Sequence, residues 1–220
     1  MDELFNYRLD ALNYKERFIR FMADNGVLRF GEFRLKSGRI SPYYIDTGNF
    51  KSGAQITKLG EFYAECISEN SIKANLLIGN ANEEIPIVIA TSMILYNKYG
   101  IDINYSIDNV IGKRLDSSDD MILIKDTLTS GNTLKNTLSE IKNIARVKIP
   151  HVIVSVDRCE RGEASALSAL QEIEKEFDVK IFSIVTIDDI IFALKNGVIA
   201  GTEYLDAMIH YKDKYAILHR

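Results

Sequence analysis

Hydrophobic and polar positions along the chain form two kinds of segment. Short apolar runs are typical of buried β-strands, and longer stretches with apolar residues three or four positions apart are typical of amphipathic helices. Apolar runs occupy 75–79, 121–125, 151–156 and 180–186, and helical patterns occupy 52–69, 85–96, 134–144, 163–177 and 187–194. Strands that alternate with helices predict an α/β fold with a parallel central sheet.

The first fifty residues follow a different pattern. A helical stretch at 14–22 is followed by short alternations, broken by glycines, that predict strands joined by a hairpin turn. No internal repeat or flexible linker interrupts the chain. We therefore expect a single domain over 1–220, with a small β-containing N-terminal lobe at 1–50 and an α/β core with C-terminal helices at 51–220.

One strand leads directly into a candidate ligand site. The apolar run that ends at Lys125 breaks into small polar residues before a helical pattern begins at Leu134. Open α/β sheets bind ligands at the carboxyl ends of their strands. Hydroxyls, an amide, a flexible glycine and the unpaired N–H groups of a helix start would suit an anion such as phosphate. These residues are Thr129, Ser130, Gly131, Asn132 and Thr133.

A purely structural role for this loop stays open. An ordinary strand-to-helix turn with a Thr or Asn cap accounts for the same residues. The loop is not a P-loop, because no Gly-Lys-Thr/Ser follows a glycine at the spacing of that motif. Hydrolysis of a nucleoside triphosphate is therefore not indicated.

Composition narrows the classes of function. With 46% apolar and 26% charged residues, the chain has the make-up of a globular protein, and no apolar run reaches membrane-spanning length. A net charge of -4 argues against a nucleic-acid partner. Cys66 and Cys159 have no metal-ligand spacing and indicate inert or partly buried thiols in a reducing compartment, with no disulfide framework. We expect a cytoplasmic protein with no membrane and no nucleic-acid partner.

Three separated motifs, at 28–43, 156–162 and 182–189, occur in an order that matches a known family. They resemble those of the bacterial orotate phosphoribosyltransferases, type I phosphoribosyltransferases of the pyrimidine pathway, over nearly the whole chain. The stretch 121–133 takes the place of the family's signature for phosphoribosyl diphosphate (PRPP). The resemblance implies a parallel-sheet type I phosphoribosyltransferase core. It also implies Mg²⁺-dependent conversion of orotate and PRPP to orotidine 5′-monophosphate and diphosphate.

The resemblance assigns roles to individual residues. Lys36 would approach the diphosphate or orotate, and Tyr44 and Ile45 would line the face of the orotate ring. Arg158 would pair with the orotate carboxylate, for which a guanidinium fork is a fitting partner, and Thr129 would lie beside the base. The ribose and 5′-phosphate would be held by Asp126, Thr127, Leu128, Thr129, Ser130, Gly131, Asn132 and Thr133.

Several of these residues also have plainer interpretations. Lys36 is explained equally by a solvated charge in a turn, and Tyr44 by a place in the core of the N-terminal lobe. Arg158 could instead pair with Asp157 or Glu160. These alternatives remain open at the level of sequence.

Three departures from the family fall on the PRPP side. The family has two adjacent acids after the strand, and in this chain the first of these two positions is Lys125. Where the family has Tyr-Lys-Gly, after the first core strand, this chain has Asn82, Glu83 and Glu84. The family's mobile basic loop is absent from 105–114. Carboxylates near a diphosphate oppose its binding, so no residue is assigned a catalytic role and none a metal.

Two functions are therefore open. The first is an orotate phosphoribosyltransferase of pyrimidine nucleotide biosynthesis with weak or absent turnover, which would use Mg²⁺ only if active. The second is a non-catalytic pyrimidine- or nucleotide-binding or regulatory paralogue, a pseudoenzyme that could partner a complete subunit. Because family members are typically dimers, we expect a homodimer. We also predict that Glu83 and Lys125, whose charges are reversed relative to the family, form an ion pair across the PRPP site.

Overall fold

The computed structural model of the chain describes residues 12–35, 38–80, 84–128, 131–145, 147, 149–161 and 167–217. The chain divides into two compact units. The N-terminal unit contains residues 1–50 and 185–215, and the core unit contains residues 51–184 and 216–220.

The core unit is built on a six-stranded sheet in the order β5-β4-β3-β6-β7-β8. Its strands are β3 (Leu76–Gly79), β4 (Asn104–Ile107), β5 (Ile111–Gly112), β6 (Met121–Leu128), β7 (His151–Asp157) and β8 (Lys180–Thr186). The neighbours β4, β3, β6 and β7 run parallel, and the short edge strand β5 runs antiparallel to β4. This confirms the predicted α/β fold with a mainly parallel sheet.

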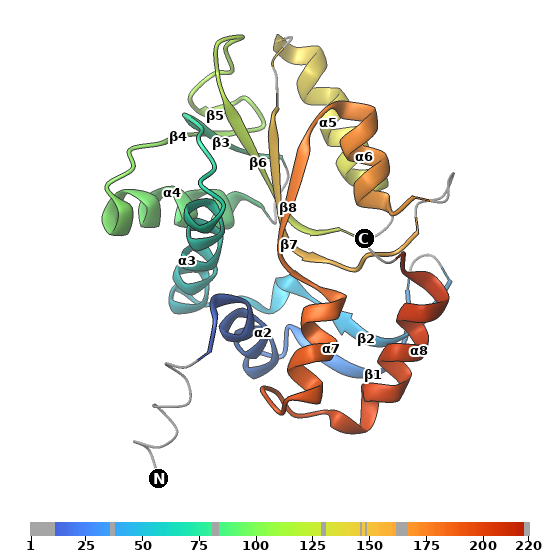
Figure 1. Cartoon of the computed structure of the whole chain (residues 1–220). Helices are drawn as coiled ribbons and strands as arrows, with labels where there is room; N and C mark the ends of the chain where they lie inside the picture. Colours follow the sequence, from blue (N-terminus) through green and yellow to red (C-terminus); the bar gives the residue numbers. More distant parts are fainter. Residues whose placement is uncertain are drawn as a thin grey trace. The chain divides into compact units, whose positions relative to one another are not determined.

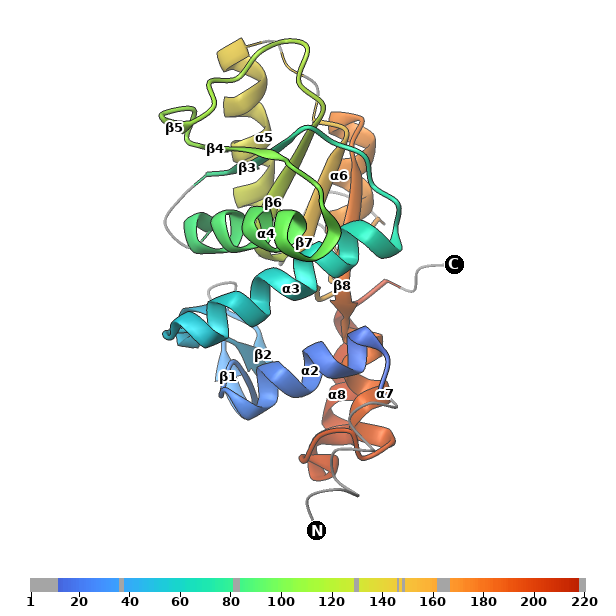
Figure 2. The same cartoon turned by 90° about the vertical axis from the view of Figure 1, so that its left-hand side faces the viewer.

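Helices cover both faces of this sheet (Figures 1 and 2). On one face lie α3 (Gly53–Glu69) and α4 (Glu84–Tyr99), and on the other lie α5 (Asn132–Ala145) and α6 (Ala169–Phe177). The helices α3 and α4 approach closely at Gly60, where an added Cβ would lie 2.8 Å from the backbone carbonyl carbon of Ala90. A parallel strand between two helical layers is apolar on both sides, which explains the unbroken apolar runs in the sequence.

The core on the α5 and α6 side joins strand and helix residues into one cluster. Leu76 and Leu123 from the sheet pack with Leu138 of α5 and Ile173 of α6, and the relative exposure of each is 0%. At roughly 1.5–3 kcal/mol for each fully buried aliphatic side chain, this cluster holds the α5 layer on the sheet. This packing therefore fixes the position of β6 relative to α5.

The N-terminal unit joins segments from both ends of the chain. Its elements are α2 (Tyr14–Asp24), β1 (Leu28–Arg34), β2 (Ile40–Ile45), η1 (Thr47–Asn49), α7 (Ile187–Lys195), η2 (Thr202–Tyr204) and α8 (Leu205–Tyr215). The strands β1 and β2 pair antiparallel, with an irregularity between Phe30 and Phe33. The predicted strands and hairpin are thus present.

Helices α7 and α8 pack with the N-terminal segment, whereas the predicted division left residues 185–215 with the core. Tyr43 of β2 is fully buried and meets the ring of Tyr211 edge-on, with centroids 5.9 Å apart. Lys15 of α2 forms an ion pair with Asp189 of α7 at 3.1 Å. Apolar burial therefore draws these two helices to the lobe. None of the helices in the described part of the chain is long and apolar enough to cross a membrane.

Candidate functional site

The carboxyl half of β6 carries a buried lysine. Lys125 is 5% exposed, although lysine is almost never buried without a partner. Its backbone carbonyl accepts a hydrogen bond at 2.6 Å from the hydroxyl of Tyr63, a fully buried residue of α3. Burial and, next, the charge of Asp126 raise the pKa of Tyr63 well above its ordinary value. Tyr63 therefore stays a neutral donor that fixes this part of the strand.

The ammonium group of Lys125 forms an ion pair with Glu84, the first residue of α4. The Nζ to Oε1 distance is 2.5 Å, and the two side chains are 6% and 3% exposed. The predicted partner was Glu83, which lies outside the described residues. The structure therefore assigns the pairing seen to the next residue, Glu84, and the prediction for Glu83 itself stays a prediction.

The surroundings of Glu84 disfavour the charged form of its carboxyl group. Burial raises its pKa, an effect that the hydrogen bond and the charge of Lys125 oppose, and the charge of nearby Asp126 adds to the increase. Its Oε2 atom is buried and has no hydrogen-bond partner among the described residues. Lys125, Glu84 and Asp126 thus interact with one another in this part of the core unit, and Lys125 is paired with Glu84.

The strand itself extends further than the sequence predicted. The ladder continues beyond Lys125, with Thr127 opposite Val156 and Leu128 opposite Asp157 of β7. Residues 126–128, predicted to lie in the binding loop, are therefore strand residues; Asp126 and Thr127 are half-buried and Leu128 is buried. Pairing with β7 satisfies backbone groups that a loop would leave open.

The predicted phosphate loop is described only in part. Thr129 and Ser130 lie outside the described residues. Gly131 has φ of +81°, a backbone conformation that favours glycine. A Cβ added there would lie 2.7 Å from Cδ1 of Ile173 in α6, so that side chain would have to move. Asn132 and Thr133 are exposed and begin α5. Their position at a helix N-terminus is compatible with an anion, as the sequence predicted.

Arg158 is placed by the turn that follows β7. It is 4% exposed, and its Nε donates to Oε1 of Glu160 at 2.7 Å. Of the alternatives left open, the pairing with Glu160 is therefore present. Cys159, between them, has φ of +54°, and its N–H donates to Asp157 Oδ1 at 2.8 Å. The turn therefore holds the guanidinium in a buried position beside Glu160, and its role toward the orotate carboxylate stays a prediction.

The remaining predicted ligand residues belong to the N-terminal unit. Lys36 lies outside the described residues. Tyr44 is half-buried, with its ring 5.5 Å from that of Phe33 and 5.4 Å from the guanidinium carbon of Arg29. Its neighbour in sequence, Tyr43, takes the core position that had been considered for Tyr44. Ile45 is half-buried and lies opposite Leu28 in the β1–β2 ladder.

The segment that replaces the family's mobile loop is held by internal bonds. Lys113 contacts both carboxylate oxygens of Asp119 at 2.5 Å. The N–H of Leu115 donates to Oδ1 of Asn109 at 2.8 Å, and exposed Arg114 donates to the carbonyl of Asn109. Arg114 is exposed, as expected of a surface charge, whereas Lys113 is half-buried and paired with the buried Asp119.

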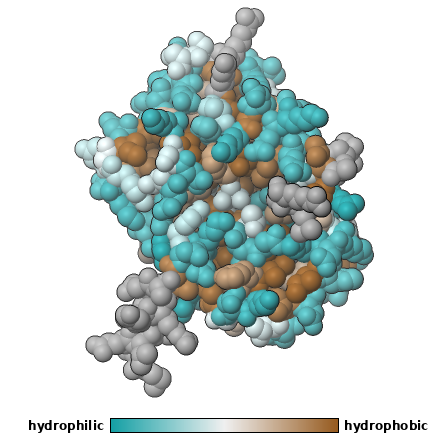
Figure 3. Space-filling view, in the orientation of Figure 1, coloured by the Kyte–Doolittle hydropathy of each residue, from teal (hydrophilic) through white to brown (hydrophobic). Residues whose placement is uncertain are grey.

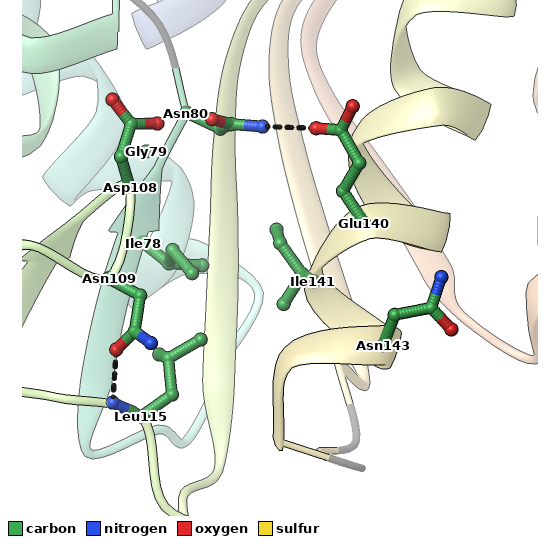
Figure 4. A pocket seen from close by; sticks show the side chains of 9 residues that line it. All are labelled: Ile78, Gly79, Asn80, Asp108, Asn109, Leu115, Glu140, Ile141 and Asn143. Atoms are coloured by element: carbon green, nitrogen blue, oxygen red, sulfur yellow. Dashed lines mark hydrogen bonds between the residues drawn. The ribbon is translucent and has the colours of Figure 1, made fainter.

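A groove that the sequence did not reveal lies on the α5 side of the sheet (Figure 4). It has a volume of about 450 Å³. Its lining comes from β3 and the residue after it, the β4–β5 turn, the segment after β5, and α5. It consists of Ile78, Gly79, Asn80, Asp108, Asn109, Leu115, Glu140, Ile141 and Asn143. The only available signal in the sequence was Asn80, a polar residue directly after a buried strand.

Metal-binding potential is limited in the described part of the chain. No group of three or more His, Cys, Asp or Glu residues there could hold a metal ion. Cys66 and Cys159 are buried and form no disulfide.

Comparisons with known proteins give a consistent result. No protein-family model matches the chain. An orotate phosphoribosyltransferase of Hamiltonella defensa is 36% identical over 218 residues, covering 94% of this chain and 98% of that protein. One from Clostridium beijerinckii is 38% identical over 201 residues, covering 86% and 89%.

Solved structures agree. The crystal structure of the orotate phosphoribosyltransferase of Francisella tularensis matches with a TM-score of 0.82 and 34% identity, over 94% of this chain and 98% of that one. UMP synthase of Leishmania donovani shares the fold, with a TM-score of 0.72 at 19% identity. Because the chain is 34–38% identical to these orotate phosphoribosyltransferases over most of its length, it belongs to the orotate phosphoribosyltransferase family.

Proposed function

We propose that this protein acts in pyrimidine nucleotide biosynthesis by binding orotate or a pyrimidine nucleotide, and that its own turnover of orotate and PRPP is weak or absent. The family reaction joins orotate to the phosphoribosyl group of PRPP and releases diphosphate. The ion pair between Lys125 and Glu84 is the observation that carries the proposal.

The pair alters the side of the site that would receive ribose and diphosphate. A cation stands where the resemblance implies an acid for the ribose diol, and it is already neutralised by Glu84. The carboxylate of Asp126, whose charge raises the pKa of Glu84, adds a negative charge close to this point, and a like charge within a few ångströms disfavours a diphosphate in a partly buried site.

The other side supports ligand binding. Arg158 is buried and positioned by Glu160, and a guanidinium is the fitting partner for a carboxylate. The N-terminus of α5, with Gly131 in its required conformation, is suited to a monophosphate. Binding of orotate or its nucleotide can therefore persist without transfer of the phosphoribosyl group.

The residues do not fit a Mg²⁺ ion delivered with PRPP. Magnesium is usually held by one or two carboxylates together with substrate phosphates. Here Glu84 is engaged by Lys125, whose positive charge lies 2.5 Å away. No step of the proposed function is routed through a metal, and Mg²⁺ belongs only to the case in which turnover occurs.

The test is a set of calorimetric titrations with orotate, orotidine 5′-monophosphate and PRPP, together with a turnover assay. We expect saturable binding of orotate or the monophosphate and negligible consumption of orotate. Turnover within about tenfold of an ordinary family enzyme, a barrier difference of about 1.4 kcal/mol, would contradict the proposal.

Two variants sharpen this test. Arg158→Lys keeps a charge beside Glu160 but loses the guanidinium fork, so orotate should bind at least several-fold more weakly while the fold is retained. Glu84→Gly with Lys125→Asp restores the family residues at these two positions and should strengthen PRPP binding. Unchanged PRPP binding in this double variant would show that the ion pair is not the obstacle.

A homodimer is part of the proposal. Helix α4 has no charged residue from 85 to 97, and Met93 and Tyr96 on its outer side are 58% and 62% exposed. Hydrophobic side chains gather over the position of α4 in Figure 3. Exposed apolar patches mark interaction sites, and a family paralogue that supplies complete machinery is a second partner such a face would accept. The two cysteines are buried and form no disulfide, which is consistent with a cytoplasmic location.

A further inference from the structure

The groove on the α5 side of the sheet contains none of the residues assigned to orotate, ribose or phosphate. Its floor is apolar: Ile78 of β3 and Ile141 of α5 are 1% and 3% exposed, and Leu115 packs partly buried against the same core cluster. At about 450 Å³ it falls within the size range of small-molecule sites. A ligand lying on this floor would bury a short apolar segment.

Among the described residues, the rim of the groove is polar and carries no positive charge. Asp108, from the β4–β5 turn, and Glu140, from α5, stand on opposite walls, and Asn80 lies between them (Figure 4). The amide of Asn80 donates to Oε2 of Glu140 at 3.3 Å. Asn143 completes the α5 wall. Two exposed carboxylates therefore face one apolar floor from two sides.

Two basic side chains of the segment between Asn109 and Leu115 have partners elsewhere. Lys113 is bound to Asp119, and Arg114 donates to the backbone carbonyl of Asn109. Neither lines the groove. Among the described residues, Asp108 and Glu140 take part in no ion pair, so both carboxylates can accept a cation from a ligand.

We propose that this groove binds an aliphatic diamine or polyamine. The methylene chain would lie on Ile78, Leu115 and Ile141, and the terminal ammonium groups would pair with Asp108 and Glu140. Anionic ligands such as nucleotides are disfavoured by both carboxylates. A bare metal ion is not indicated, because no three acidic or other ligating side chains converge among the described residues and because the floor is apolar.

The test is an NMR titration of the ¹⁵N-labelled full chain with putrescine and spermidine at physiological salt. We expect saturable shifts of the backbone amides of Asn80, Asp108, Glu140 and their neighbours. The compound 1,4-butanediol has the same carbon chain without charge and should bind much more weakly. Saturable binding of 1,4-butanediol or uridine without binding of putrescine would overturn the proposed ligand class.

Variants separate a built site from general attraction to an acidic protein. Because both carboxylates are exposed, Asp108→Asn and Glu140→Gln should each weaken putrescine binding about twofold to fivefold. Asn143→Phe should fill the groove and abolish binding, with circular dichroism confirming the fold. Glu69→Gln removes an equally exposed acid at the end of α3 and should change nothing. Equal losses in Glu69→Gln and Glu140→Gln, or unchanged binding in Asn143→Phe, would overturn the proposal.

Discussion

A buried lysine and glutamate in contact do not stabilise a protein simply because their charges are opposite. Each ion loses its hydration, and this loss can exceed the attraction between the charges. Lys125 and Glu84 have lost nearly all contact with solvent, and Glu84 leaves one oxygen without a partner among the described residues. The pair is therefore better understood as two mutually dependent residues than as a source of net stability.

This dependence predicts a large coupling energy. Lys125→Met leaves the Glu84 carboxylate buried without its cation and should lower the free energy of unfolding by about 3–5 kcal/mol. Glu84→Gln combined with Lys125→Met removes both charges, so it should cost clearly less than the sum of the single variants. Urea unfolding of the four proteins gives the coupling energy.

A surface pair supplies the control for this cycle. Lys58 and Glu61 are 2.6 Å apart, but the lysine side chain is 48% exposed. Lys58→Met should change stability by less than about 1 kcal/mol. Additive effects of the Lys125 and Glu84 changes would show that the two side chains do not interact in solution.

The shifted pKa of Glu84 predicts how stability varies with pH. Burial raises this pKa above its ordinary value of 4.5, so the folded state holds the proton more tightly than the unfolded state. The stability that Glu84 contributes is therefore fully present below pH 4.5 and is lost as pH rises through the folded pKa.

Glutamine at position 84 cannot ionise, which makes Glu84→Gln the reference for this effect. The stability of the wild type minus that of the variant should fall as pH rises from 4.5 toward neutrality, and urea unfolding at several pH values measures it. A difference that grows with pH would mean that the folded pKa is lowered instead.

At this scale, the sequence indicated that Lys125 needs an acidic partner near the start of α4, but it did not identify Glu84. The apolar pattern in the sequence starts at 85, whereas α4 starts at Glu84, and a sequence pattern does not fix a helix start to a single residue. The contact of Arg158 with Glu160 was one of two alternatives in the sequence. A spacing of two residues does not show which acid a turn will bring into contact.

At the scale of elements, strand β6 shows where a local pattern fails. Lys125, Asp126 and Thr127 are polar, so the strand was predicted to end at 125. In the structure, the ladder with β7 continues to Leu128. Tertiary pairing overrides local preference here. It holds Lys125 in the interior, where Glu84 is its ion-pair partner among the described residues.

The turn between β6 and α5 leads to a prediction about Gly131. Alanine there would adopt a left-handed conformation and would also press on Ile173, since the Cβ would be 2.7 Å from that side chain. Gly131→Ala should therefore cost about 1–3 kcal/mol and weaken binding of a monophosphate at the start of α5. Thermal unfolding and calorimetry measure the two effects.

Gly53 is the matched control, because a Cβ added there meets no atom within 4 Å and the residue lies in the first turn of α3. Gly53→Ala should be neutral or slightly stabilising. If both alanine variants behave alike, the close contact with α6 does not constrain the loop.

At the scale of the whole molecule, alternating strands and helices were enough to predict the α/β sheet, and the order of three motifs was enough to indicate the family. The grouping of α7 and α8 with the N-terminal segment was not predictable in this way. Tyr43 and Tyr211 are far apart in the sequence, so the sequence pattern does not show that they share one buried cluster. The groove was hidden for the same reason, because its walls come from three separate segments.

The outer side of α4 predicts how two copies associate. A solvated helix in a protein with 26% charged residues would normally carry charges on its outer side, yet 85–97 carries none. Two chains of charge -4 repel each other except where their facing surfaces are uncharged, and a twofold axis lets the same stripe pack against itself.

Met93→Lys would place a charge in that contact, with little effect on folding because the residue is 58% exposed. The dissociation constant of the dimer should rise at least tenfold, about 1.4 kcal/mol, as measured by sedimentation velocity over a concentration series. Phe192→Lys on α7 is the matched control, since Phe192 is 54% exposed and does not belong to α4. A wild-type chain that is monomeric at every concentration, or a dimer equally sensitive to both variants, would show that α4 is not the contact surface.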